Sequence, residues 1–195
     1  MTVFFDSHVR EEVVNLLPGE FGASREGRIY STVLGSCVAV VIYDAANRVG
    51  GMNHFMLPGA VEDRRFYATE NGRYGMYAME LLINAVIKEG GERSRLVAKV
   101  VGGGSVLAGS GLVSRVPDNN VNFAFDYLGT EGIPVVSSHV GGSFGRKIYL
   151  YAASGRVLLR RIGKGHLAPV AEEEARYLAR ARTDALEAEK RLTLF

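Results

Sequence analysis

The chain has 195 residues, of which 47% are hydrophobic and 23% are charged, and its formal net charge is +2. This length supports one substantial hydrophobic core and fits a single domain over residues 1–195 better than two. A charge so close to balance, with Lys and Arg scattered along the chain, argues against a nucleic-acid-binding protein. Charged residues interrupt the apolar ones in the N-terminal stretch MTVFFDSHVREEVV, so the sequence predicts neither a signal peptide nor membrane insertion.

The first part of the chain is expected to lead into an organised core that begins near Arg28. Residues 1–28 are interpreted as a mixed lead-in, with a turn at Pro18-Gly19 and irregular backbone beyond it. Val, Ile and Tyr dominate residues 29–57, which predicts strands that are interrupted at Gly35-Ser36 and joined through residues 44–47.

The second part of the chain mixes helices with further strands. Apolar residues recur at intervals of three and four over residues 73–89, and Gly90-Gly91 follows, which predicts a helix that covers one face of a sheet. The remaining pattern predicts strands over residues 96–101 and 134–139, a short helix over 121–130, and a hairpin over 147–151 and 156–161. Pro169 opens a charged segment that favours a helix. Because the strands do not alternate regularly with helices, the expected fold class is α+β.

Cys37 is the only cysteine of the chain, so no intramolecular disulfide can form, which agrees with a cytoplasmic location. If residues 44–47 form a four-residue loop, Tyr43 pairs with Arg48 and Cys37 lies directly opposite His54. Opposed side chains share one face of a sheet, about 5 Å apart at Cβ. A slip of one residue would place the two side chains on opposite faces. The register that pairs Tyr43 with Arg48 would therefore place the Cys37 thiol beside the His54 imidazole.

A single buried cysteine is more often a small apolar core residue than a nucleophile. The context of Cys37 favours the nucleophile, because Gly35 and Ser36 precede it and a glycine turn lets backbone amides approach a developing oxyanion. A neighbouring imidazolium would stabilise the reactive thiolate. His54 could equally be a buried core histidine, so the alternative of a noncatalytic structural protein stays open.

The sequence predicts no metal or other cofactor. Its cysteine and histidines, among them Cys37, His54, His139 and His166, lack the spacing of metal ligands. The glycines at 102–104 follow a predicted strand, as in a phosphate-binding loop, but they match neither the dinucleotide-binding fingerprint nor a P-loop.

Several segments together resemble the CheD family of chemoreceptor glutamine deamidases over residues 28–162. The strongest are GSCVAVVIYD and GGMNHFMLP, in which the Asn-His pair ends seventeen residues after the cysteine. RYGMYAMELLINAVIKEGG, LVAKVVGGGS, NVNFAFDYLGTEGIPVV and GGSFGRKIYLYAASGRVLLR continue the likeness. Val116-Pro117 departs from the family pattern, and Asn120 falls at one of its asparagine positions. Residues 163–195 extend beyond the likeness as a charged and helical segment.

The resemblance implies a layered α+β cysteine hydrolase, with mixed β-sheets and flanking helices, in which Cys37 is the nucleophile and His54 is the general base and acid. It also implies a hydroxyl residue that orients the histidine, either Ser31 or Thr32. Alternation along a strand places Ser31 on the face of Cys37, unless the break at Gly35 resets the pleat. Gly35, Ser36 and Asn53 are expected at the oxyanion and at the approach of the substrate.

The implied substrates are glutamine side chains of methyl-accepting chemotaxis receptors, which would become glutamates with release of ammonia. The same acyl-enzyme could form from a glutamyl methyl ester, so a methylesterase side activity stays open. The family also docks a CheC-type phosphatase, which leaves a regulatory binding module as the alternative function.

Overall fold

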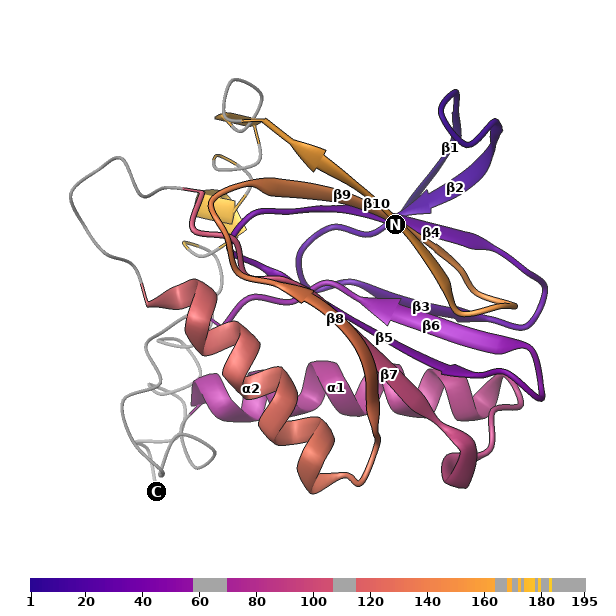
Figure 1. Ribbon diagram of the computed structural model, residues 1–195. Coiled ribbons are helices and arrows are strands. Elements are labelled where there is room, and N and C mark those ends of the chain that lie inside the picture. Colours follow the sequence, from indigo (N-terminus) through magenta and orange to yellow (C-terminus); the bar gives the residue numbers. More distant parts are fainter. Residues whose placement is uncertain are drawn as a thin grey trace.

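Two five-stranded sheets stack on one another, and two helices cover the outer face of the second sheet, in the computed structural model of the chain (Figure 1). The structure describes residues 1–57, 70–106 and 115–163, together with residues 168, 169, 172, 174–177, 179 and 183. Both sheets mix parallel and antiparallel pairs. The predicted α+β class, with layered sheets and flanking helices, is therefore confirmed.

The first sheet has the strand order β1-β2-β4-β9-β10. Its strands are β1 (Thr2–Asp6), β2 (Glu11–Asn15), β4 (Ile29–Leu34), β9 (Gly145–Tyr151) and β10 (Arg156–Ile162). Strands β2 and β4 run parallel, whereas the other neighbours are antiparallel. The C-terminal hairpin of β9 and β10 thus follows the sequence prediction and completes the sheet that contains β4.

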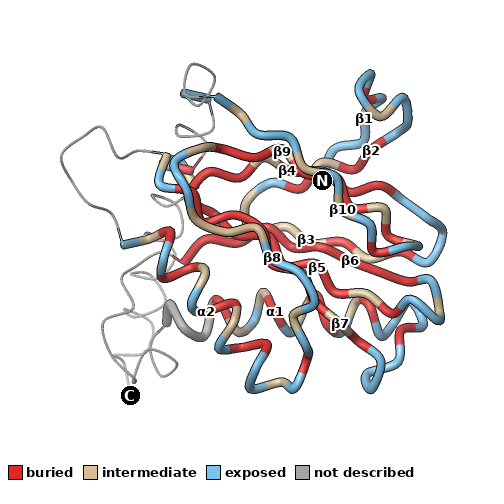
Figure 2. Tube along the Cα trace, in the orientation of Figure 1, coloured by how far each residue is buried: buried red, intermediate tan, exposed pale blue. Residues whose placement is uncertain are grey.

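The second sheet has the order β3-β6-β5-β7-β8. Its strands are β3 (Phe21–Ser24), β6 (Val49–Asn53), β5 (Val38–Asp44), β7 (Val97–Gly102) and β8 (Val135–Val140). The chain leaves the first sheet after β4 and enters the second at β5, so the interruption at Gly35-Ser36 is a crossing between sheets. Figure 2 shows β5, β6 and β7 as a largely buried centre, whereas β1 lies exposed at an edge.

The helices are α1 (Glu70–Lys88) and α2 (Val116–Thr130), and a short 3₁₀ turn, η2 (Arg93–Arg95), precedes β7. The prediction of α1 is confirmed. Helix α2 begins before the predicted residue 121, because Pro117 stands in its first turn, where a missing N–H costs nothing. Among the helices of the described ranges, none combines the length and the apolar character of a membrane span.

Two apolar clusters hold the layers together. One joins the second sheet to the helices through side chains such as Val40, Phe55, Leu82 and Phe123. The other lies between the sheets and includes Leu34, Cys37, Met52 and Ile148. Odd and even residues of β5 alternate between these clusters, as expected for a strand buried on both faces.

The prediction of irregular backbone beyond Pro18-Gly19 is wrong, because β3 follows this turn, and the mixed lead-in over residues 1–28 also contains β1 and β2. The turn at Pro18-Gly19 is confirmed, with Gly19 at φ +88°. The three strands are short, and four of the five residues of β1 are exposed, so the segment lacks a clear apolar alternation. Pairing with β4 and β6 stabilises them, and such pairing is a tertiary effect.

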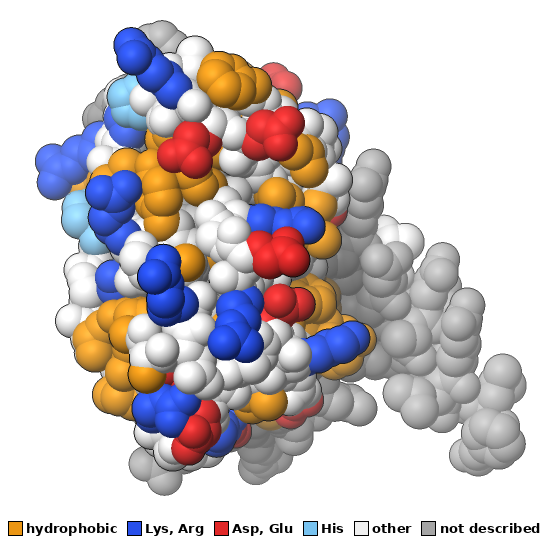
Figure 3. Space-filling view, turned by 90° about the vertical axis from the view of Figure 1, so that its right-hand side faces the viewer, with side chains coloured by type: hydrophobic (Ala, Val, Ile, Leu, Met, Phe, Trp, Pro, Cys, Tyr) orange, Lys and Arg blue, Asp and Glu red, His pale blue; other side chains and the backbone are white. Residues whose placement is uncertain are grey.

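The surface charge follows the balanced composition. On the face shown in Figure 3, basic and acidic side chains are interspersed with apolar ones, and neither sign forms a continuous tract. This face offers no electrostatic footprint for nucleic acid.

Candidate active site

Cys37 lies at the crossing between the two sheets, on the loop that joins β4 to β5, and its side chain is completely buried. The loop following β7 supports this crossing through two backbone hydrogen bonds. Gly103 N–H donates to the Cys37 carbonyl (2.8 Å), and Gly104 N–H donates to the Gly35 carbonyl (2.7 Å). The cysteine is therefore presented on a loop whose shape the neighbouring glycine turn defines.

Gly102 explains why this neighbouring turn is rich in glycine. A Cβ atom at Gly102 would lie 2.2 Å from the carbonyl oxygen of Cys37, and the residue has φ +127°. Only glycine combines this backbone conformation with such a close approach. The turn that the sequence likened to a phosphate loop thus holds the backbone around Cys37.

His54 directly follows β6, and the register between β5 and β6 differs from the predicted one. Asp44 pairs with Val49, so Tyr43 pairs with Gly50 and not with Arg48. The turn is therefore one residue further along, at residues 45–48. The slip amounts to two positions on the partner strand, and an even slip leaves every side chain on its original face. The prediction of direct opposition is wrong, but the predicted common face of Cys37 and His54 is retained.

The side chain of His54 points between the sheets and contacts Thr32 of β4. Thr32 Oγ1 lies 2.7 Å from His54 Nδ1 and 2.7 Å from the carbonyl oxygen of Leu16. Thr32 is therefore the hydroxyl residue beside the histidine. The geometric preference for Ser31 is wrong, because the chain crosses between sheets at Gly35 and the pleat is reset. Ser31 Oγ is buried and has no hydrogen-bond partner among the residues that the structure describes.

The hydrogen bonds determine which ring nitrogen of His54 carries the proton. A carbonyl oxygen only accepts, so the Thr32 hydroxyl donates its one proton to Leu16. The same oxygen atom then accepts from His54, whose Nδ1 must carry a hydrogen. Nε2 is consequently the unprotonated nitrogen, and it is buried without a hydrogen-bond partner in the described part of the chain. This tautomer leaves Nε2 available as a base.

Burial determines the charge of His54. Desolvation lowers the pKa of His54 from its ordinary value of 6.5 to about 4, although the nearby carboxylate of Glu174 acts in the opposite direction. The imidazole is therefore neutral at pH 7. His54 is therefore not the imidazolium expected beside the thiol, and it is poised to accept a proton and not to stabilise a preformed thiolate.

Asn53, which the sequence placed at the substrate approach, has a structural role instead. Its Oδ1 accepts from Val40 N–H (3.0 Å), and its Nδ2 donates to the Ala78 carbonyl of α1 (3.2 Å). Adjacent residues of a strand point to opposite faces, so Asn53 faces the helices whereas His54 faces the first sheet. The side chain ties β5 to α1.

Asn120 is a site residue whose role the sequence did not reveal. It is completely buried on α2, and its Nδ2 donates to the Ser36 carbonyl (3.0 Å) while its Oδ1 accepts from Leu57 N–H (2.8 Å). It thereby holds the cysteine loop against the segment after His54. The available signal was its place at one of the asparagine positions of the family that the sequence resembles.

Glu174 is the second residue that sequence reasoning missed. It belongs to the C-terminal segment, whose described residues between 168 and 183 are helical as predicted. Its carboxylate accepts from the backbone N–H groups of Gly35 (3.0 Å), Ser36 (3.1 Å) and Cys37 (3.1 Å). Charge-assisted bonds of this kind are stronger than neutral ones. The loop of Cys37 is thus an anion-binding turn.

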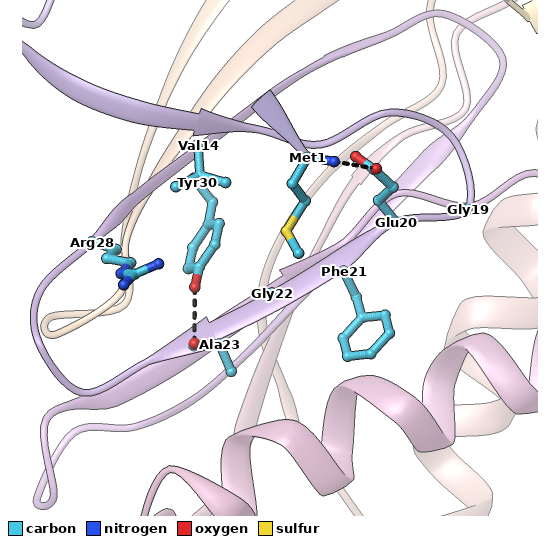
Figure 4. Close-up of a pocket in the computed structure, with 9 residues that line it drawn as sticks. All are labelled: Met1, Val14, Gly19, Glu20, Phe21, Gly22, Ala23, Arg28 and Tyr30. Carbon is cyan, nitrogen blue, oxygen red and sulfur yellow. Dashed lines mark hydrogen bonds and ion pairs between the residues drawn. The ribbon is translucent and has the colours of Figure 1, made fainter. Parts of the chain in front are cut away.

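A separate cavity of about 420 Å³ lies between the edges of the two sheets (Figure 4). Tyr30 and Arg28 line it from one side, and Glu20, which is paired with the N-terminal amine, lies on the other. Neither Cys37 nor His54 is among its lining residues, so the cavity is not part of the candidate active site.

Comparison with known proteins gives the class. A family model described as "CheD chemotactic sensory transduction" matches residues 56–161. A protein of Laribacter hongkongensis named "Probable chemoreceptor glutamine deamidase CheD" is 45% identical over 179 residues, which are 92% of this chain and 86% of the relative. A relative of Shewanella oneidensis with the name "Probable chemoreceptor glutamine deamidase CheD 1" is 42% identical, with the same two coverages.

The chain therefore belongs to the CheD family. The range matched by the family model begins just after His54, so the model itself does not cover the cysteine loop. Among solved structures, the Bacillus licheniformis hypothetical protein YfiH is 16% identical, with a TM-score of 0.37 over 64% of this chain and 50% of that chain. A likeness this partial supports no assignment.

Proposed function

We propose that this chain is a deamidase that converts glutamine side chains of chemoreceptors into glutamates with release of ammonia. Membership of the CheD family supports the reaction, since the relatives carry this activity in their names. Within the same proposal, the enzyme acts in the cytoplasm on methyl-accepting chemotaxis receptors, and residues 1–195 form one catalytic domain with its C-terminal extension.

The observation that carries the proposal is the convergence of three backbone N–H groups, from Gly35, Ser36 and Cys37, on one carboxylate. Amides that hold an oxyanion on the cysteine's own loop are what acyl transfer from a carboxamide requires. The neutral imidazole of His54, with a bare Nε2 and a fixed tautomer, supplies a base on the same side of the sheet.

In the proposed reaction, His54 Nε2 takes the proton of the Cys37 thiol, and the sulfur attacks the carboxamide carbon of the substrate glutamine. The C–S bond forms as the carbonyl π electrons move onto oxygen, and the amides of the cysteine loop stabilise this oxyanion. His54 then returns the proton to the departing nitrogen, so ammonia leaves and a thioester remains. Water, activated by His54, hydrolyses the thioester to glutamate and restores the thiol.

Thr32 acts through His54 in this scheme. By accepting from Nδ1–H it keeps Nε2 unprotonated, and it holds the ring in one orientation. Thr32 is therefore a positioning residue, and Cys37 and His54 are the catalytic residues.

The test is incubation of the purified chain with a chemoreceptor cytoplasmic fragment. Ammonia release and amide-to-acid conversion are followed together, the latter by peptide mass spectrometry. Wild type should convert specific glutamines, whereas Cys37→Ala and His54→Ala should not. His8→Ala is the matched control, because His8 is an exposed histidine in the turn between β1 and β2. Conversion that persists in Cys37→Ala would contradict the proposed mechanism.

The family resemblance adds a CheC-type phosphatase as a partner. A pull-down with wild type and with Cys37→Ala tests it: binding retained by the inactive variant would support a regulatory role beside catalysis. Hydrolysis of a glutamyl methyl ester in the same receptor fragment would reveal the methylesterase side activity.

A further inference from the structure

Glu174 occupies the anion-binding turn completely. Its Oε1 accepts from Gly35 N–H and Cys37 N–H, and its Oε2 accepts from Ser36 N–H and from the Ser36 hydroxyl (2.6 Å). The side chain is 3% exposed although it belongs to a charged segment. A Cβ atom at Gly35 would lie 2.8 Å from Glu174 Oε1, so the glycine makes room for this carboxylate.

The four donors suit a carboxylate, which can accept at both of its oxygens. The carboxamide of a substrate glutamine would offer them its single oxygen. A glutamate side chain is also the group that the proposed reaction produces. Glu174 thus presents to the cysteine loop the chemical group of the reaction product, attached to the chain itself.

The described residues on either side of Glu174 pack as a cover over the site. Tyr177, one helical turn after Glu174, packs against the cluster between the sheets and lies 6.5 Å, ring to ring, from Tyr74 of α1. Glu172 and Arg176 are exposed, so the described part of the segment has one face toward the site and another toward solvent. Beneath it, Cys37 and His54 are 0% and 3% exposed. A receptor glutamine cannot reach Cys37 while Glu174 is docked.

We propose that Glu174 is an intramolecular product mimic, which the C-terminal helical segment inserts into the glutamine side-chain subsite so that the enzyme inhibits itself. The inference rests on the proposed deamidase function. Substrate and Glu174 compete for the same amides, so the enzyme is active only in the fraction of molecules in which the segment is displaced.

The first test needs no receptor. The rate at which iodoacetamide alkylates Cys37 is measured by mass spectrometry in the full chain, with Glu174→Ala and Glu174→Gln beside Glu172→Ala and Glu172→Gln as controls on the exposed face. Both changes at Glu174 should accelerate alkylation by roughly tenfold or more, because each weakens the docked state. The controls should react like wild type. Thermal melting of each variant identifies unfolding, and Glu174→Gln preserves the shape of the side chain.

The second test is steady-state deamidation of the receptor fragment. A tethered competitor lowers the apparent affinity for substrate in proportion to the open fraction. Glu174→Ala should therefore lower KM by about the factor gained in alkylation and leave kcat unchanged. The Glu172→Ala control should match wild type in both constants.

The two tests fail in different ways. Alkylation of Cys37 that is equally slow in the folded Glu174 variants and in wild type would overturn the product mimic. A raised kcat with an unchanged KM would overturn it too, because the segment would then not compete with substrate. Faster alkylation without deamidation by any variant would support the self-covering of Cys37 and contradict the proposed function instead.

Discussion

Replacing Thr32 by valine tests the reasoning about His54 most directly, because valine keeps the shape of threonine and removes only the hydroxyl. Two hydrogen bonds of 2.7 Å meet at Thr32 Oγ1. Without it, His54 Nδ1–H keeps only the Leu16 carbonyl, at 3.4 Å. A buried donor left so weakly paired costs about 1–3 kcal/mol in free energy of unfolding. The tautomer with a bare Nε2 also loses its support.

A loss of the same size in the transition state would reduce kcat/KM for deamidation by roughly 5- to 150-fold. We expect both losses in Thr32→Val. Urea denaturation measures the loss in free energy of unfolding, and ammonia release from the receptor fragment measures the loss in kcat/KM. Ser31→Ala is the matched control: Ser31 Oγ is buried and bonds to none of the described residues, so its removal should change stability by less than about 0.5 kcal/mol. Wild-type kcat/KM in Thr32→Val, or an equal loss in Ser31→Ala, would refute the assignment of Thr32.

Two further predictions concern stability. Since burial lowers the pKa of His54 to about 4, the unfolded chain binds more protons than the folded one between about pH 4 and 6.5. The free energy of unfolding should therefore fall by about 2–3 kcal/mol from pH 7 to pH 4.5, and less so in His54→Gln; an equal fall in both proteins would contradict this origin. Gly102→Ala should lower the free energy of unfolding by roughly 2 kcal/mol or more. Its melting temperature should therefore fall far more than that of Gly132→Ala. Both glycines have positive φ, but only at Gly102 would a Cβ collide with the Cys37 carbonyl, so equal losses would exclude that contact as the cause.

Much of the second sheet and its helix cover could be predicted from the sequence. The apolar repeat before Lys88 predicted α1, and the β-branched runs predicted β5 and β7. Local periodicity is sufficient for such elements, because their burial depends on one dominant apolar face or on complete enclosure. The short strands β1, β2 and β3 escaped prediction, since their stability comes from partners elsewhere in the chain.

The candidate site divides in the same way. That Cys37 and His54 share a face followed from the two-residue period of strands, and it withstood an error of two residues in register. The choice between Ser31 and Thr32 did not follow, because it depends on how the chain crosses from one sheet to the other at Gly35.

The sequence by itself thus determined the fold class, the common face of Cys37 and His54, and the likeness to the CheD family. Only the tertiary structure decided what surrounds that pair: Thr32 on His54, Asn120 on the Ser36 carbonyl, and Glu174 on the amides of the cysteine loop. Each of these contacts joins groups that are distant in the chain, and no local pattern encodes them. Their formation depends on the stacking of the layers, which places separate segments within hydrogen-bonding distance.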